Sequence, residues 1–133
     1  MKIYAALPPH GEADIIHAAL PSGATILELG CGTGRIADSL VALGHRVVAV
    51  DSSREMLSYL RSAEPVHSTI EALALAERFD GVVLASVLVN TFDPDQRTQF
   101  LRTAVRHMAP GATLVVQRHA PGWAETVVSI TWK

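Results

Sequence analysis

The chain has 133 residues, of which 49% are apolar and 18% charged, with a formal net charge of −2 at pH 7. This composition fits a single globular domain, residues 1–133, and excludes the broad basic surface of a nucleic-acid-binding protein. A lone cysteine, Cys31, excludes a disulfide framework and a multi-cysteine metal site. Because no segment reads as a signal peptide or a membrane span, we expect a soluble, cytoplasmic protein without membrane partners.

Short apolar segments typical of buried strands alternate with segments of helical periodicity. The predicted strands are 25–29, 47–50, 66–68, 79–84, 113–117 and 126–132. The predicted helices are 12–20, one closed by Gly44, one after Asp51, a short one reaching about Ala76, and one from Pro94 to about Pro110. This alternation predicts an α/β fold, in which helices cover both faces of a doubly wound, mostly parallel sheet.

Capping residues and apolar stripes refine three of the predicted helices. Ser52 with Glu55 and Ser68 with Glu71 fit capping boxes, and Asp93 fits an N-cap before Pro94. The inward-facing residues expected on the first and third of these helices are Met56, Leu57 and Leu60, and then Phe100, Leu101, Ala104, Val105 and Met108.

A glycine-rich turn, ILELGCGTG at 26–34, follows the first of these predicted strands. Glycine at 30, 32 and 34 permits positive φ and lets a ligand approach the backbone. Asp51 ends the next strand, where a carboxylate can accept hydrogen bonds from ribose hydroxyls. Because ligands of such sheets bind at the carboxyl ends of strands, the two features together predict a nucleoside ligand.

Two further residues indicate which nucleoside is expected. A dinucleotide site needs GxGxxG, but Arg35 stands where the third glycine should be. Glu28, two residues before the first glycine, would repel a pyrophosphate and suit a cationic ligand with an amino group.

The segments ELGCGTG, VVAVDSSREML and FDGVVLASVLVN, in this order, resemble the class I S-adenosylmethionine-dependent methyltransferases over residues 25–118. The resemblance implies a Rossmann-like fold, S-adenosylmethionine as cofactor, S-adenosylhomocysteine as product, and a small-molecule methyl acceptor.

The resemblance also implies roles for individual residues. Glu28 would act near the cofactor ammonium group, and Asp51 would bind the ribose hydroxyls. Met56 would border the adenine or else fill the core of its helix. The remaining implied cofactor-binding residues are Gly30, Cys31, Gly32, Thr33, Gly34, Ser52, Ser86 and, folding over the cofactor from the N-terminal segment, Tyr4.

One position departs from the family pattern. Thr69 stands where an aspartate commonly accepts a hydrogen bond from the adenine amino group, and an uncharged acceptor is the weaker partner. Ile70 is expected to contribute its backbone N–H.

Methyl transfer from a sulfonium is an in-line displacement, in which positioning supplies much of the rate. A base is needed only when the acceptor must lose a proton, and His119 and His10 are the candidates. Asn90 is a candidate for orienting the acceptor. His17, His45, His67 and His107 are expected to be structural, and Cys31 is expected to be a turn residue that is not a nucleophile.

The family usually has seven strands ending in an antiparallel hairpin, whereas this sequence stops at Lys133 in or just after its sixth predicted strand. We therefore expect missing C-terminal strands and a fragment of a longer enzyme, in which 126–133 resembles the first strand of a β-rich lid. We also expect a free edge on the predicted strand 113–117, through which a homodimer could form.

Two alternatives to a methyltransferase stay open from the sequence. One is a binding module that holds the cofactor but lacks an acceptor lid and turns nothing over. The other is an NAD-dependent oxidoreductase, which Arg35 and Glu28 disfavour.

Overall fold

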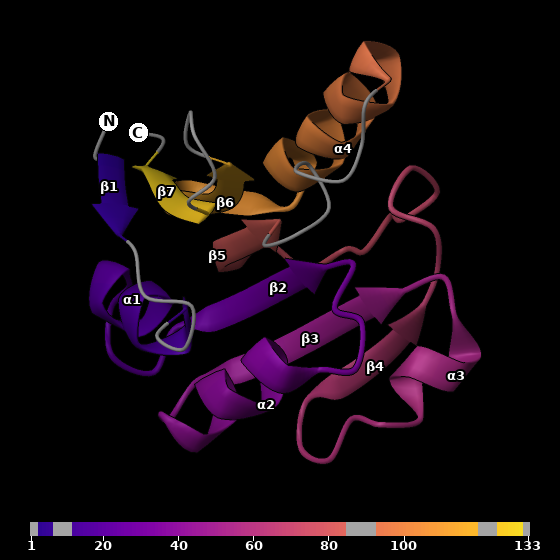
Figure 1. Ribbon diagram of the computed structural model, residues 1–133, viewed down its shortest axis with the longest axis horizontal. Coiled ribbons are helices and arrows are strands. Elements are labelled where there is room, and N and C mark those ends of the chain that lie inside the picture. Colours follow the sequence, from indigo (N-terminus) through magenta and orange to yellow (C-terminus); the bar gives the residue numbers. More distant parts are fainter. Residues whose placement is uncertain (1–2, 7–11, 85–92, 120–124, 132–133) are drawn as a thin grey trace.

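A single seven-stranded sheet organises the molecule. The computed structural model describes residues 3–6, 12–84, 93–119 and 125–131. Within these ranges the strand order is β1-β7-β6-β5-β2-β3-β4 (Figure 1). The strands are β1 (Ile3–Ala6), β2 (Thr25–Leu29), β3 (Arg46–Asp51), β4 (Glu64–His67), β5 (Phe79–Leu84), β6 (Met108–His119) and β7 (Glu125–Thr131). The helices are α1 (Glu12–Ala19), α2 (Arg35–Ala42), α3 (Arg54–Leu57) and α4 (Pro94–Arg106).

The strands from β4 to β6 run parallel to their neighbours, whereas β7 is antiparallel to β6 and β1 is antiparallel to β7. The parallel part confirms the predicted α/β fold, and the predicted strands 25–29 and 79–84 have the bounds of β2 and β5. Among the described residues, no helix has the length and apolar character needed to cross a membrane.

Helices cover both faces of the sheet, as expected from strands that are buried on both sides. On one face, α1 and α2 pack against alternate strand residues that include Ile26, Val47 and Val83. On the other face, α4 packs through Phe100 and Ala104 against the intervening strand residues. The carboxyl ends of the parallel strands therefore lie between two layers of helix.

The predicted free edge at 113–117 does not exist in this chain. β6 is paired with β5 on one side and with β7 on the other, in a register that sets Val115 opposite Ser129. The segment expected to begin a lid is therefore part of the sheet, and β1, which the sequence did not predict, extends it further. The premise for a dimer through this edge is wrong.

Helix α4 is shorter than predicted and buries a different set of residues. It ends at Arg106, and β6 begins two residues later and passes through Gly111, whose φ is +78°. Leu101 and Val105, predicted to face inward, are 37% and 50% exposed.

Thr103 and His107 are buried instead of Leu101 and Val105. Their polar side chains can be buried because each one has a hydrogen-bond partner within the fold. His107 Nε2 accepts from the Leu75 N–H at 3.0 Å, and its Nδ1 lies 2.7 Å from the Thr103 carbonyl oxygen. The Thr103 hydroxyl pairs with Arg106.

The predicted capping boxes at Ser52 and Ser68 are wrong. Ser53 caps α3, accepting from the Met56 N–H at 3.2 Å, because Asp51 Oδ1 already holds the Ser53 N–H at 2.8 Å. Residues 70–72 form a turn and no helix follows, with Thr69 Oγ1 accepting from the Ala72 N–H. By contrast, Asp93 caps α4 as predicted.

Asp38 on α2 anchors the loop that follows α3. Its carboxylate accepts from the backbone N–H groups of Arg61, Ser62 and Ala63 and from the Ser62 hydroxyl. These hydrogen bonds outweigh the opposing effect of burial and hold the pKa of Asp38 below its ordinary value of 3.8. The loop is thereby fixed over the start of α2.

Replacing this carboxylate tests the anchor. Asp38→Asn should lower the free energy of unfolding by about 1–2 kcal/mol at pH 7, because an amide cannot accept all of these hydrogen bonds. Since the folded-state pKa is depressed, the difference from wild type should shrink as the pH falls below 3.8, the ordinary value for aspartate. Urea titrations at several pH values measure this, with Ser62→Ala as a control that removes only the hydroxyl. A loss no larger than that of the control would contradict the prediction.

Candidate functional site

The glycine turn between β2 and α2 is built on left-handed backbone. Gly30, Gly32 and Gly34 have φ values of 72°, 57° and 85°. The N–H groups of Gly30 and Cys31 both donate to the Val50 carbonyl oxygen, at 2.8 and 2.9 Å. The turn is thus tied to the end of β3, and its alternate glycines are required by conformation.

The two later glycines meet different surroundings. A Cβ added to Gly34 would lie 2.1 Å from Leu60 Cδ2, in the loop that Asp38 anchors. A Cβ added to Gly32 would meet nothing within 4 Å. Gly34 therefore serves packing, whereas Gly32 presents its backbone to open space where a ligand can approach.

Asp51 joins the turn to the next strand end. Its Oδ2 accepts from the Gly32 N–H at 2.9 Å, and its Oδ1 accepts from the Ser53 N–H at 2.8 Å. A carboxylate has about four lone-pair sites, so each oxygen can still accept a further hydrogen bond. The predicted acid and the predicted turn are brought together.

Glu28 is the buried acid of the site. Its side chain is 2% exposed, and its Oε2 is buried without a hydrogen-bond partner. Burial raises the pKa of this carboxyl to about 8, although the charge of Arg35 opposes the shift and that of Asp38 adds to it. Near neutral pH Glu28 therefore holds a proton that a cationic partner could displace.

Cys31 is a turn residue, as predicted. It is 8% exposed, and burial, with Glu28 and Asp51 nearby, raises the pKa of its thiol to about 12. A thiol that stays protonated is a poor nucleophile.

The residues predicted for the adenine end lie around the ends of β3 and β4. Ser52 and Thr69 are exposed, whereas Ile70 is 8% exposed. Met56 is 36% exposed, so it does not fill the core of its helix. His67, expected to be structural, places its Nε2 2.9 Å from the Ser52 carbonyl oxygen and ties the two strand ends together.

For several residues of the predicted site, the structure gives only the position in a strand, and others fall outside the described residues. His119 ends β6, at the same edge of the sheet as the carboxyl ends of the other parallel strands. Tyr4 lies in β1, which β7, β6 and β5 separate from β2. His10, Ser86 and Asn90 fall outside the described residues.

The remaining histidines bond within the fold, as expected. His17 Nδ1 lies 2.8 Å from His45 Nε2, and His45 Nδ1 lies 3.3 Å from the Ala24 carbonyl oxygen. No three metal-ligating side chains gather in the part of the chain that the structure describes.

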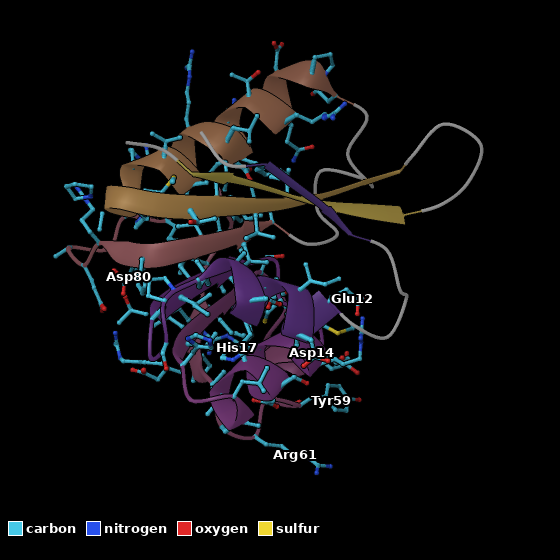
Figure 2. The ribbon with its side chains drawn as sticks, turned by 90° about the vertical axis from the view of Figure 1, so that its left-hand side faces the viewer. Glu12, Asp14, His17, Tyr59, Arg61 and Asp80 are labelled. Atoms are coloured by element: carbon cyan, nitrogen blue, oxygen red, sulfur yellow. The ribbon has the colours of Figure 1, made fainter. Side chains whose placement is uncertain are left out.

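An ion pair between an exposed arginine and a buried glutamate, beside the turn, was not predicted. Arg35, the first residue of α2, binds both carboxylate oxygens of Glu12, the first residue of α1, at 3.1 and 3.3 Å. Figure 2 shows Glu12 on the opposite side of the molecule from Asp80, which is bonded to Thr25 at the amino ends of the strands. No sequence motif marks the pair, because its partners are 23 positions apart.

Known proteins share this fold, and a family model matches the segment that contains the turn. Residues 26–111, more than half of the chain, match the family described as "Methyltransferase domain". A cypemycin N-terminal methyltransferase from Streptomyces sp is 37% identical over 99 residues, which cover 67% of this chain and 39% of that protein. A ubiquinone biosynthesis O-methyltransferase from Xanthomonas axonopodis pv. citri is 31% identical over 108 residues, covering 71% of this chain and 42% of that protein.

Among solved structures, a TehB-like SAM-dependent methyltransferase from Corynebacterium glutamicum superposes with a TM-score of 0.80 at 23% identity, covering 95% of this chain and 89% of that one. The fold is that of the Rossmann-like methyltransferases. The chain belongs to the methyltransferase domain family, which confirms the resemblance to class I S-adenosylmethionine-dependent enzymes. It spans about two fifths of the length of these two curated relatives.

The raised pKa of Glu28 predicts how stability depends on pH. The folded protein keeps the proton up to about pH 8, whereas the unfolded chain loses it near 4.5. Stability should therefore fall as the pH rises through this window, by at most about 1.4 kcal/mol per pH unit from this group. Glu28→Gln should flatten the curve and become more stable relative to wild type toward pH 8. Urea unfolding between pH 5 and pH 8 measures it.

The exposed Glu71 provides the matched control. Glu71→Gln removes a carboxyl from the surface, and its curve should run parallel to that of wild type. A parallel curve for Glu28→Gln as well would show that Glu28 is ionised in the folded protein.

Proposed function

We propose that this domain binds S-adenosylmethionine and transfers its methyl group to a small-molecule acceptor, leaving S-adenosylhomocysteine. The observation that carries the proposal is the unpartnered Oε2 of Glu28, buried beside a glycine turn whose Gly32 faces open space. Membership of the methyltransferase family supports the same ligand.

The residues fit the charges and polar groups of this cofactor. Glu28, once ionised, would bind the ammonium group of the methionine part, which supplies the partner that Oε2 lacks. Asp51 would accept from the two ribose hydroxyls, since each of its oxygens has a lone pair to spare. The open Gly32 backbone would lie against the chain between these two ends.

The bound cofactor supplies a methyl group already activated on a sulfonium. The protein then has to hold that methyl group in line with the acceptor and to keep water away from both. Glu28 and Asp51 would do this from two neighbouring strands, which their backbone pairing holds in register. His119, Asn90 and His10 remain our candidates for orienting or deprotonating the acceptor.

A small-molecule acceptor is supported by the second relative, whose name places it in ubiquinone biosynthesis. The name of the first relative places its methyl group on the N-terminus of cypemycin, so the acceptor atom differs between relatives. Of the alternatives, an NAD-dependent oxidoreductase is not favoured, because the family is that of methyltransferases. The other alternative, a module that binds the cofactor without turning it over, is distinguished from an enzyme by a turnover assay.

Calorimetry with S-adenosylhomocysteine tests the cofactor. We expect saturable binding to one site and none with NADH; the reverse would overturn the proposal. Formation of S-adenosylhomocysteine from S-adenosylmethionine in a screen of small amine and hydroxyl acceptors then tests turnover. Binding without any turnover would favour the binding module.

The ribose contact has its own test. Asp51→Ala should weaken S-adenosylhomocysteine binding by about 1–3 kcal/mol, because hydrogen bonds to a charged group are lost. Since Asp51 also holds the Gly32 N–H, the 2′-deoxy analogue of the ligand is needed to separate the two effects. Wild type should bind the analogue more weakly than the parent ligand, whereas Asp51→Ala should bind both alike.

Asp80→Ala is the matched control, because Asp80, like Asp51, is a carboxylate that accepts a hydrogen bond from a backbone N–H group. It removes the bonds to Thr25 at the far end of the sheet and should lower stability without changing affinity. If Asp51→Ala still distinguishes the two ligands, the ribose assignment is wrong.

A further inference from the structure

The loop between α3 and β4, residues 58–63, lies against the glycine turn. A Cβ added to Gly34 would be 2.1 Å from Leu60 Cδ2 and 3.2 Å from Leu60 Cγ, so the leucine side chain covers the Cα atom of this glycine. Leu60 also packs against the buried cluster that contains Cys31 of the same turn. The turn is therefore supported by the loop at Gly34, whereas its backbone is open at Gly32.

One carboxylate holds this loop. Asp38 Oδ2 accepts from the Arg61 N–H at 2.9 Å. Its Oδ1 accepts from the N–H groups of Ser62 and Ala63, each at 3.0 Å. These three donors directly follow the leucine in the sequence. The N–H of Asp38 itself donates to the Gly34 carbonyl oxygen at 2.8 Å, so one residue is bonded both to the turn and to the loop that covers it.

The other end of the same segment is held by the acid of the site. Asp51 Oδ1 accepts from the Ser53 N–H at 2.8 Å, at the start of α3. Residues 53–63 are thus fastened by a carboxylate at each end, Asp51 at the first residue and Asp38 at the last three. Met56, which we expect beside the adenine, lies between these two points and is 36% exposed.

The support matters because the turn consists largely of glycine. Gly30, Gly32 and Gly34 all have positive φ, and glycine loses more conformational freedom on folding than any other residue. A turn that loses its support would spend less time in the conformation that a ligand needs. The apparent affinity for the ligand falls in proportion to that fraction of time.

We propose that Asp38 and Leu60 are positioning residues for the cofactor, Asp38 by holding the loop 58–63 and Leu60 by supporting the glycine turn at Gly34. This inference rests on the proposed function and extends it to a loop outside the turn and the two strand ends. It gives the four hydrogen bonds of the Asp38 carboxylate a part in ligand affinity as well as in stability.

The test compares Asp38→Asn, Leu60→Ala and the double variant by calorimetry with S-adenosylhomocysteine, at a temperature where each is folded. Each single change should weaken binding by about five- to tenfold, because the turn is less often in the binding conformation. Because both act on one contact, the double variant should lose no more than about twofold beyond the weaker single variant. Leu60→Ala changes no charge, so a loss in this variant cannot come from the charge of Asp38.

Asp80→Asn is the matched control for Asp38→Asn. It also turns a carboxylate that holds a backbone N–H group and a hydroxyl into an amide, but at Thr25, at the amino ends of the strands. Its affinity should stay within about twofold of wild type, because additivity and independence hold for distant sites.

A second measurement needs no ligand. In Asp38→Asn the amide hydrogens of Gly32 and Gly34 should exchange at least about fivefold faster than in wild type, because local opening of the turn becomes easier. The Thr25 amide, in the same spectra, reports the general loss of stability and should change by a smaller factor. Should Asp38→Asn fail to fold, Ser62→Ala, which removes only the hydroxyl hydrogen bond, replaces it with a smaller change in the same direction.

The outcomes separate the two proposals. If wild type binds no S-adenosylhomocysteine, the proposed function fails and the role in affinity with it, and the exchange rates alone decide whether the loop supports the turn. If wild type binds but Asp38→Asn or Leu60→Ala binds equally well, the proposed function stands and the inference is overturned. Losses that add in full in the double variant, or glycine amides that change no more than the Thr25 amide, would overturn it as well.

Discussion

The hydrogen bond from the Gly32 N–H to the Asp51 carboxylate is the contact on which the rest of the site depends. It joins the turn after β2 to the end of β3, and the same carboxylate holds Ser53 at the start of α3. One acid therefore sets the path of two loops. Its position is fixed in turn by the register of the two strands, in which Leu29 lies opposite Val50. The spacing between the acidic groups of the site is thus a property of the sheet, which packs on both faces and deforms little.

Much of this arrangement could be predicted because it depends on local patterns. The strand ends at Leu29 and Asp51, the glycine turn and the Asp93 cap are all encoded by residues adjacent in the sequence. The errors arose where tertiary contacts decided. Ser52 has the sequence of a cap, but Asp51 holds the next residue and moves the start of α3 by one position.

Other features had no local signal. Leu101 and Val105 fit an inward-facing apolar stripe, yet His107 is buried. Both of its ring nitrogens have a backbone partner, one in Leu75, which is distant in the sequence, and one in Thr103, which is near. The pairing of Glu12 with Arg35 and the burial of Glu28 Oε2 depend on how α1 and α2 lie on the sheet. Strand β1 was not predicted from its own sequence and exists through its pairing with β7.

That pairing has a consequence for the order in which the sheet is completed. Ile3 lies opposite Ile130 and Ala6 opposite Val127, so β1 and β7, side by side in Figure 1, come from nearly opposite ends of the chain. The parallel strands pair with neighbours that are nearer in the sequence, whereas the partner of β1 is β7, near the other end of the given sequence. Closing so long a loop carries the largest entropic cost in the sheet. The pairing that completes this edge of the sheet therefore joins the two described strands that lie farthest apart in the sequence.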